Sequence, residues 1–293
     1  MNMHAPTETR ALAAASAPDA PLPGYQRLRT LVAAALALVV LLSIALGAAL
    51  LPDDGLATNL SARALPPGAD HLFGTDPLGR DMFTRTVKGL ALSMQVGLLS
   101  AGFAALLALV LGVSAALHPK LDAVVGLLID LVMSLPHLVL LILVSFALGG
   151  GTRGVIIAVI VSHWPTLARV LRAEMRQVLA ADYVQVARML GRSRLYVARR
   201  HVLPQLLPQV LIGALLLFPH AILHEAALTF LGFGLAPHLP ATGVLLAESM
   251  RSLAAGLWWL GVLPGVCLLG MVLMFGRIAE GLRLVLDPRR AQD

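Results

Sequence analysis

Polar side chains with acid–base and hydrogen-bonding groups interrupt one of the long apolar stretches of the sequence. Asp130, Ser134 and His137 are spaced at i, i+4 and i+7, which predicts that they share one face of a helix. The apolar stretch begins about nine residues before Asp130, so its carboxylate is expected roughly 14 Å along the helix, near the middle. A polar stripe at that depth is costly. It indicates either the lining of a polar pathway or a hydrogen-bonded contact between helices.

A second polar group, His220, His224 and Glu225, lies late in another apolar stretch. The two histidines are one helical turn apart, a spacing that allows two imidazoles to share a metal ion. Two histidines alone are a weak metal signal. We expect this group to line a pathway or to form a helix contact, without a metal site.

The sequence lacks the motifs that common catalytic and nucleotide-binding sites require. No Gly-x-x-x-x-Gly-Lys-Ser/Thr phosphate loop is present, and the glycine run 149–151 is followed by Thr152 and Arg153 rather than by the required lysine. No His-Glu-x-x-His motif occurs, and the serines and histidines lack a recognisable catalytic setting. The single cysteine, Cys267, excludes a disulfide within the chain. We therefore expect neither catalytic residues nor a cofactor in this chain.

The composition indicates a membrane protein. Hydrophobic residues make up 58% of the 293 residues and charged residues only 13%, whereas a soluble domain is about half apolar and about a quarter charged. The formal net charge of +6 does not indicate nucleic-acid binding, because the basic residues flank the apolar runs. That arrangement is typical of orientation in a bilayer and of contact with anionic lipid.

Six apolar runs predict an all-α, polytopic membrane protein with six transmembrane helices. About 20 apolar residues in a helix cross a hydrocarbon core of about 30 Å, and only a helix satisfies their backbone polar groups there. The first run is longer than the core of a signal peptide, although small residues near Ala48 and Ala49 keep cleavage open as an alternative. The runs cover residues 31–51, 91–117, 121–148, 154–171, 206–235 and 258–278.

The basic residues predict the orientation of these helices. Most of them lie before the first run, between the fourth and fifth runs, or after the sixth. Loops rich in arginine and lysine face the cytoplasm, so we expect both termini on that side. The expected division is a disordered cytoplasmic tail (1–30), the first helix (31–51), a periplasmic or interfacial segment (52–90), a five-helix core (91–282) containing a basic loop (172–205), and a cytoplasmic tail (283–293).

The basic loop at 172–205 is too charged to cross a membrane and too regular to be disordered. Its apolar residues recur every three or four positions, which predicts a helix whose second part Asp182 caps. Gly191 predicts the end of that helix, and 193–201 predicts a second short helix that closes before Pro204. Such a compact projection either enters a groove on a partner protein or lies on the lipid surface. The apolar positions are Val178, Leu179, Tyr183, Val186 and Leu190.

The same loop resembles the "EAA loop" of the binding-protein-dependent permeases of ABC transporters. The resemblance rests on Tyr183-Val-Gln-Val-Ala-Arg-Met-Leu-Gly191, followed by Arg200-His-Val-Leu-Pro204. It implies that this loop docks onto a separate ATPase. The residues that match the family motif are Ala187, Gly191, Leu203 and Pro204.

Two residues of the loop depart from that motif. Gln185 stands where the motif has glutamate, and Val186 stands where it has its first alanine. The glutamine keeps the length of the side chain but loses the charge, so the resemblance implies docking without a salt bridge from this position.

Three further segments resemble the dipeptide, oligopeptide and nickel branch of these permeases. They are His71-Leu-Phe-Gly-Thr-Asp-Pro-Leu-Gly-Arg-Asp81, Glu225-Ala-Ala-Leu-Thr-Phe-Leu-Gly-Phe-Gly234, and the C-terminal segment from Trp258-Trp259 to Pro288. The first of them is similar to a segment of the second permease subunit in this branch. Its Asp and Arg residues are expected either to contact an external binding protein or to clasp each other.

The resemblance implies a bacterial inner-membrane importer. Two homologous permeases would form the pathway, two cytoplasmic ATPases would bind ATP and Mg²⁺, and a periplasmic or lipid-anchored binding protein would deliver substrate. The chain itself is then not an enzyme. Its expected cargo is a di- or oligopeptide, with nickel or a metal chelate as the alternative. A secondary transporter is the alternative of a different class, although we find no internal repeat typical of one.

Overall fold

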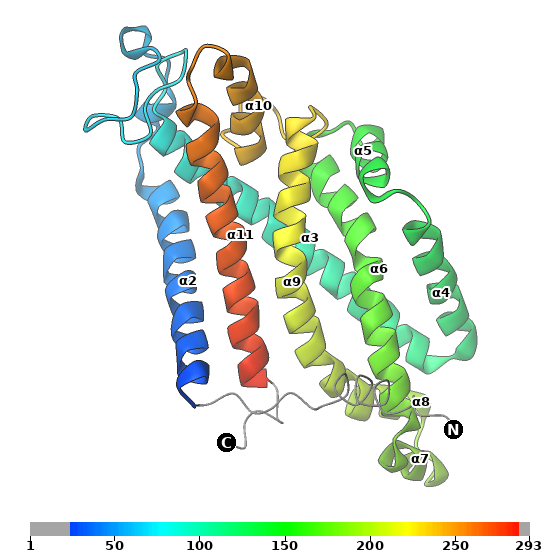
Figure 1. The fold of residues 1–293 in the computed structure, drawn as a ribbon. Helices are drawn as coiled ribbons and strands as arrows, with labels where there is room; N and C mark the ends of the chain where they lie inside the picture. The colour runs from blue at the N-terminus through cyan, green and yellow to red at the C-terminus, as the bar shows by residue number, and fades with distance from the viewer. Residues whose placement is uncertain (1–23, 287–293) are drawn as a thin grey trace, which may run out of the picture.

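The chain forms a bundle of long helices (Figure 1), in a computed structural model that describes residues 24–286. Within that range no β-strand forms, and Thr75 and Asp81 make only an isolated bridge. Five helices are long and apolar enough to cross a membrane, and a bent pair of helices supplies a sixth crossing if it counts as one span. The predicted all-α polytopic fold is therefore confirmed. The five helices are α2 (Gly24–Leu50), α3 (Met82–Leu117), α6 (Gly151–Ala180), α9 (Leu203–Phe230) and α11 (Trp259–Leu286).

The third apolar run forms two helices rather than one. α4 (Pro119–Met133) and α5 (His137–Ala147) meet at an angle of 95°. Pro136 lies at the junction, immediately before α5, and has no N–H with which to continue the hydrogen bonding of α4. The expectation of one continuous helix over 121–148 is therefore wrong. Pro136 is the sequence signal that predicts the break, because the residue before a proline disfavours helix.

α3 packs against α2, α6 and α9 and crosses the bundle obliquely in Figure 1. Small side chains line its buried face and allow neighbouring helices to approach closely. At Gly97, an added Cβ would lie 2.6 Å from Cγ1 of Ile222 on α9, so this contact between α3 and α9 depends on the glycine. The buried alanines of α3 are Ala91, Ala101, Ala104, Ala105, Ala108 and Ala115.

The helices extend beyond the apolar runs at both ends of the bundle. α2 begins at Gly24, so residues 24–30 of the expected tail are helical, and α3 begins at Met82, inside the expected interfacial segment. α6 continues to Ala180, and α11 continues to Leu286. An apolar run marks only the hydrocarbon core, whereas a helix can continue into the headgroup region. Residues 1–23 and 287–293, on which the rest of the tail predictions fall, lie outside the described residues.

The two ends of the bundle carry different structures (Figure 1). The loop end carries segment 51–81 and also α10 (Thr242–Leu253), a helix that the apolar runs did not predict. Segment 51–81 contains two short 3-10 helices, η1 (Asp53–Leu56) and η2 (Leu60–Ala62). The hairpin end carries residues 181–202, together with the start of α2 and the end of α11.

Four charged residues join segment 51–81 to α3 and α10, and we call them the loop-end ion-pair network (Asp76, Arg80, Arg85 and Glu248). Arg85 on α3 is 3% exposed and donates to Asp76 and to Glu248, both at 2.8 Å. Arg80 reaches the same two carboxylates, at 2.6 Å and 3.3 Å. The backbone N–H groups of Leu78 and Arg80 also donate to Asp76. The Asp–Arg clasp, one of the two alternatives expected for this segment, is therefore present.

Candidate functional site

A helical hairpin projects from the hairpin end of the bundle (Figure 1). α6 ends at Ala180, α7 (Asp182–Met189) follows, and the chain turns at Gly191 before α8 (Arg194–Val197). We call residues 181–202 the α7–α8 hairpin. It occupies most of the loop that the sequence predicts to contact a partner.

The turn of the hairpin depends on Gly191, as predicted. Its φ of +76° lies in the left-handed region, which a side chain with a Cβ disfavours. Its N–H donates to the carbonyl of Arg188 at 2.9 Å, and the N–H of Arg192 donates to the carbonyl of Ala187 at 3.1 Å. These two bonds satisfy carbonyls at the end of α7 that would otherwise lack partners.

Buried side chains anchor the α7–α8 hairpin to the bundle. Val184, Val197 and Val202 are at most 1% exposed and belong to the core cluster that also includes residues of α3, α6 and α9. The guanidinium of Arg194 donates to the carbonyl of Leu117, the last residue of α3, at 3.1 Å. The hairpin is therefore attached to several membrane helices at once.

The helix expected over the first half of the loop is interrupted. Ala181 has an extended backbone, with ψ of 142°, and separates α6 from α7. Asp182 is the first residue of α7, and Ala181 occupies the capping position without a side-chain bond, so the predicted cap at Asp182 is wrong. The interruption divides the apolar stripe, because Val178 is buried on α6 while Val186 and Leu190 point outward.

No break separates the hairpin from α9. α8 passes into a π-helical turn, η3 (Ala198–Val202), and then into α9 at Leu203. Ser193 caps α8, because its hydroxyl accepts from the N–H of Tyr196 at 3.2 Å. Pro204 lies in the first turn of α9, where a missing N–H is tolerated, so the predicted helix end before Pro204 is wrong.

The outer face of the hairpin presents apolar side chains beside arginines. Met189 is 86% exposed and Leu190 is 75% exposed, while Tyr183 and Val186 are about half exposed. Single exposed apolar residues are ordinary, but several on one projecting turn of chain indicate an interaction surface. The exposed arginines of the hairpin are Arg188, Arg192, Arg194, Arg199 and Arg200.

The structure does not bring Asp130, Ser134 and His137 onto one helix face. Asp130 lies on α4, where its side chain is 78% exposed and pairs with Arg169 at 3.7 Å. The hydroxyl of Ser134 donates to the carbonyl of Leu131 at 2.7 Å. His137 begins α5, beyond the bend. The predicted single polar stripe is therefore wrong, because the chain changes direction between the second and third residues.

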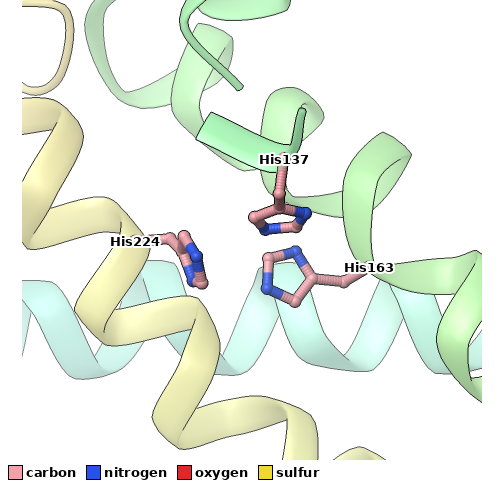
Figure 2. Close-up of side chains that lie close together, drawn as sticks. All are labelled: His137, His163 and His224. Carbon is pink, nitrogen blue, oxygen red and sulfur yellow. The ribbon is translucent and has the colours of Figure 1, made fainter. Parts of the chain in front are cut away.

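Three imidazoles meet where α5, α6 and α9 come together, and we call them the trihistidine cluster (His137, His163 and His224). Figure 2 shows the three rings directed toward one another. One ring nitrogen from each residue lies within 4.8 Å of the other two. His220 is exposed on α9 and is not part of the cluster. Sequence reasoning missed His163, because no spacing rule links it to histidines in two other apolar runs.

Glu225 is completely buried inside the chain, at 0% exposure. Its Oε1 accepts from the hydroxyl of Thr229 at 2.9 Å, and its Oε2 has no hydrogen-bond partner within residues 24–286. Side chains of α3 and α10 also form a buried bond, between the hydroxyls of Ser93 and Thr242 at 3.0 Å. Of the two roles predicted for Glu225, this burial favours a helix contact over the lining of a pathway.

A family model described as "Binding-protein-dependent transport system inner membrane component" matches residues 108–292, a range that contains the whole hairpin. This chain belongs to that family. The permease is accordingly a multi-pass inner-membrane protein of ABC-transporter type, and its family is one of transport components rather than of enzymes.

Curated relatives place the permease in the dipeptide branch. A putative peptide transport system permease of Brucella suis is 38% identical over 256 residues, which are 86% of each chain. The dipeptide transport system permease DppC of Bacillus subtilis is 31% identical, over 83% of this chain and 77% of that one. The probable D,D-dipeptide transport system permease DdpC of Escherichia coli is 32% identical, over 89% and 87%.

A solved structure shares the fold of the permease. It is the crystal structure of an amino acid ABC transporter with histidines, and its TM-score is 0.55 at 17% sequence identity. The match covers 70% of the permease and 95% of the other chain. At this identity the likeness concerns the helical arrangement alone.

The structure gives a physical reason for the glutamine in the hairpin motif of this permease. Nε2 of Gln185 donates to the carbonyl of Leu179 at 2.8 Å, which ties α7 back to the end of α6. An ionised glutamate is only an acceptor and could not make this bond. Gln185 therefore stabilises the hairpin from within.

The two remaining motif residues, Leu203 and Pro204, are the first two residues of α9. Leu203 is half-buried and Pro204 is exposed. Pro204 lines an open cavity of about 920 Å³ between α6, α9 and α11, together with Glu174, Gln177, Gln205 and Arg283.

Proposed function

We propose that this chain is a permease subunit of an ATP-driven importer of di- or oligopeptides. It pairs with a second, homologous permease to form the pathway, two cytoplasmic ATPases bind and hydrolyse ATP with Mg²⁺, and an external binding protein delivers the cargo. In this arrangement the hairpin end and both termini face the cytoplasm, in keeping with the excess of arginine there.

The observation that carries this proposal is the α7–α8 hairpin. It combines an exposed apolar tip at Met189 and Leu190 with a buried base at Val184 and Val197. An exposed apolar projection suits the groove of a partner, and a buried base lets movement of that partner reach the bundle. The residues that form or support this docking element are Tyr183, Gln185, Ala187, Gly191, Leu203 and Pro204.

The names of the relatives favour peptide cargo, since three of them are described as peptide or dipeptide transport permeases. Nickel or a metal chelate is the alternative within the same architecture. The cognate binding protein decides between them, because a ligand that binds only the folded state raises its melting temperature. Protection by dipeptides, and not by Ni²⁺ or its chelates, is the expected result.

Uptake in cells or proteoliposomes tests the proposal directly. Peptide uptake is expected to require both permeases and to vanish when the ATPase subunits carry a disabling change in their phosphate loop. Uptake that persists with the disabled ATPase and depends on a proton gradient would instead identify a secondary transporter.

We propose that Asp130 lines the pathway, because a carboxylate within an apolar run is costly unless it faces water or a polar partner. Asp130→Ala is then expected to lower uptake several-fold without lowering the amount of assembled complex. Asp130 is exposed on α4, and its 3.7 Å pair with Arg169 is also exposed, so the pair contributes little to stability. Uptake and co-purification of the other subunits measure the two effects separately. Glu280→Ala is the matched control, because it removes another exposed pair, with Arg277, elsewhere on the surface. Equal uptake by the two variants would show that Asp130 does not line the pathway.

A further inference from the structure

We propose that the trihistidine cluster binds a divalent transition-metal ion of the Zn²⁺ class. The three ligands come from three helices, with His137 at the start of α5, His163 within α6 and His224 late in α9. Their ring centroids are 4.5 to 5.0 Å apart, and Figure 2 shows the rings grouped around a common centre. This inference concerns a site within the permease and does not depend on the identity of the cargo.

Backbone carbonyls fix the tautomer of two of the three rings. Nδ1 of His163 lies 2.9 Å from the carbonyl oxygen of Val159, and Nδ1 of His224 lies 2.6 Å from that of His220. A carbonyl only accepts, so each Nδ1 carries the proton and each neutral ring keeps the lone pair of Nε2 free. The hydroxyl of Ser162 donates to the carbonyl of Val159 at 3.1 Å and accepts from Nδ1 of His163 at 2.8 Å, in keeping with this tautomer. Metal-binding histidines are commonly oriented in this way, by donating the second ring N–H to a carbonyl.

The third ring supplies a nitrogen that lacks any other partner. Nε2 of His137 is buried and makes no hydrogen bond with any of residues 24–286. A buried polar atom without a partner is destabilising, because it has lost its hydrogen bonds to water and gained none in return. Coordination of an ion would satisfy this nitrogen and would draw the three rings together.

The spacing of the nitrogens is close to that of a metal site. Three nitrogens bound tetrahedrally to one ion at about 2.1 Å lie about 3.4 Å from one another. The nitrogens of the cluster lie within 4.8 Å of one another, so a closure of at most about 1.4 Å between any two of them brings them to bonding geometry. A small rotation of the His137 ring about χ2, a broad torsion for histidine, contributes to such a change and leaves the carbonyl bonds of His163 and His224 in place.

The ligand set selects the class of ion. Neutral imidazole suits Zn²⁺, Ni²⁺ and Cu²⁺, whereas Mg²⁺ and Ca²⁺ prefer carboxylate and carbonyl oxygens, which this group lacks. Three histidines leave the fourth position of a tetrahedral ion to water or another small ligand. A bound ion would link α5 to α6 and α9 and would hold the bend between α4 and α5 in place.

Metal content and thermal stability of the assembled transporter test the proposal. The complex is purified without a polyhistidine tag, reconstituted in lipid nanodiscs and titrated with Zn²⁺. The wild-type complex is expected to bind one more ion per copy of this chain than the His163→Gln complex, and Zn²⁺ is expected to raise its melting temperature. His137→Gln and His224→Gln are expected to weaken binding at least about tenfold. Co²⁺ is expected to give the visible absorption bands of a tetrahedral site.

His220→Gln is the matched control, because it removes an exposed histidine one turn from His224 and leaves the accepting carbonyl in place. It is expected to keep wild-type Zn²⁺ binding. Zn²⁺ binding that is unchanged in all three cluster variants, or reduced equally in His220→Gln, would overturn the proposal. If His163→Gln does not assemble, the His137 and His224 variants give the same decision.

Discussion

Gly191→Val is expected to lower peptide uptake about tenfold and to reduce co-purification of the ATPase subunits. Gly191 turns the α7–α8 hairpin with φ of +76°. A left-handed conformation costs a residue with a Cβ roughly 1–2 kcal/mol, and more for a β-branched one. An added Cβ would have no heavy atom within 4 Å, so the penalty arises from the backbone and not from a collision. Uptake and pull-down of the ATPase, at equal membrane levels of the permease, measure the effect.

Gly191→Asn tests whether the left-handed backbone conformation at position 191 is what matters, or the presence of glycine itself. Asparagine enters the left-handed region more readily than other residues with a Cβ. It should therefore retain most of the uptake and most of the ATPase contact. Wild-type uptake by the valine variant, or equal loss in both variants, would show that the turn of the hairpin does not carry the coupling.

Arg85→Ala is expected to destabilise the permease by about 3–5 kcal/mol. Arg85 is buried and contacts both carboxylates of the loop-end ion-pair network, Asp76 and Glu248, at 2.8 Å. Its loss leaves Asp76, whose side chain is 3% exposed, with less compensation for its charge. Removing one partner of a buried ion pair is costly because the other charge stays desolvated. The melting temperature and the yield of the assembled complex report the effect.

Arg80→Ala is the matched control, because Arg80 contacts the same two carboxylates but its side chain is 21% exposed. It should lower the melting temperature much less, since Arg85 still pairs with Asp76 and water reaches the site. Combining Arg85→Ala with Asp76→Asn should cost less than the sum of the single changes, because the two residues interact directly. Equal effects of Arg80→Ala and Arg85→Ala would contradict the importance assigned to burial.

The membrane-spanning helices could be predicted from the lengths of the apolar runs. The elements that were predicted wrongly or missed have local causes. Six runs predicted the spans because the requirement for internal backbone bonding in hydrocarbon leaves few alternatives. The prediction of one continuous helix over 121–148 was wrong because it counted apolar side chains and did not consider the backbone. Pro136 interrupts the backbone hydrogen bonding of a helix even where its neighbours are apolar. α10 was missed because its amphipathic segment contains Glu248 and is too short to cross a membrane.

The candidate site was predictable where it depends on local geometry and not where it depends on packing. The bend at Gly191 follows from the conformation that glycine alone reaches easily. The trihistidine cluster depends on how α5, α6 and α9 meet, and the separation of His163 from its partners along the chain carries no periodic signal. The bond from Gln185 to the carbonyl of Leu179 likewise requires the break between α6 and α7 at Ala181. The regular spacing of the apolar residues predicted a continuous helix there and so did not reveal this break.

α8, η3 and α9 form one continuous run of helical residues from Arg194 to Phe230, with Pro208 and Pro219 inside it. At about 1.5 Å per residue, its 37 residues span roughly 55 Å. No loop interrupts this run, so a displacement of α8 is passed on to α9 instead of being absorbed by an irregular connection. In the proposed orientation, a tilt of a few degrees at the end that bears the hairpin displaces the opposite end of this run sideways by several ångströms, which is enough to change the width of a pathway beside it.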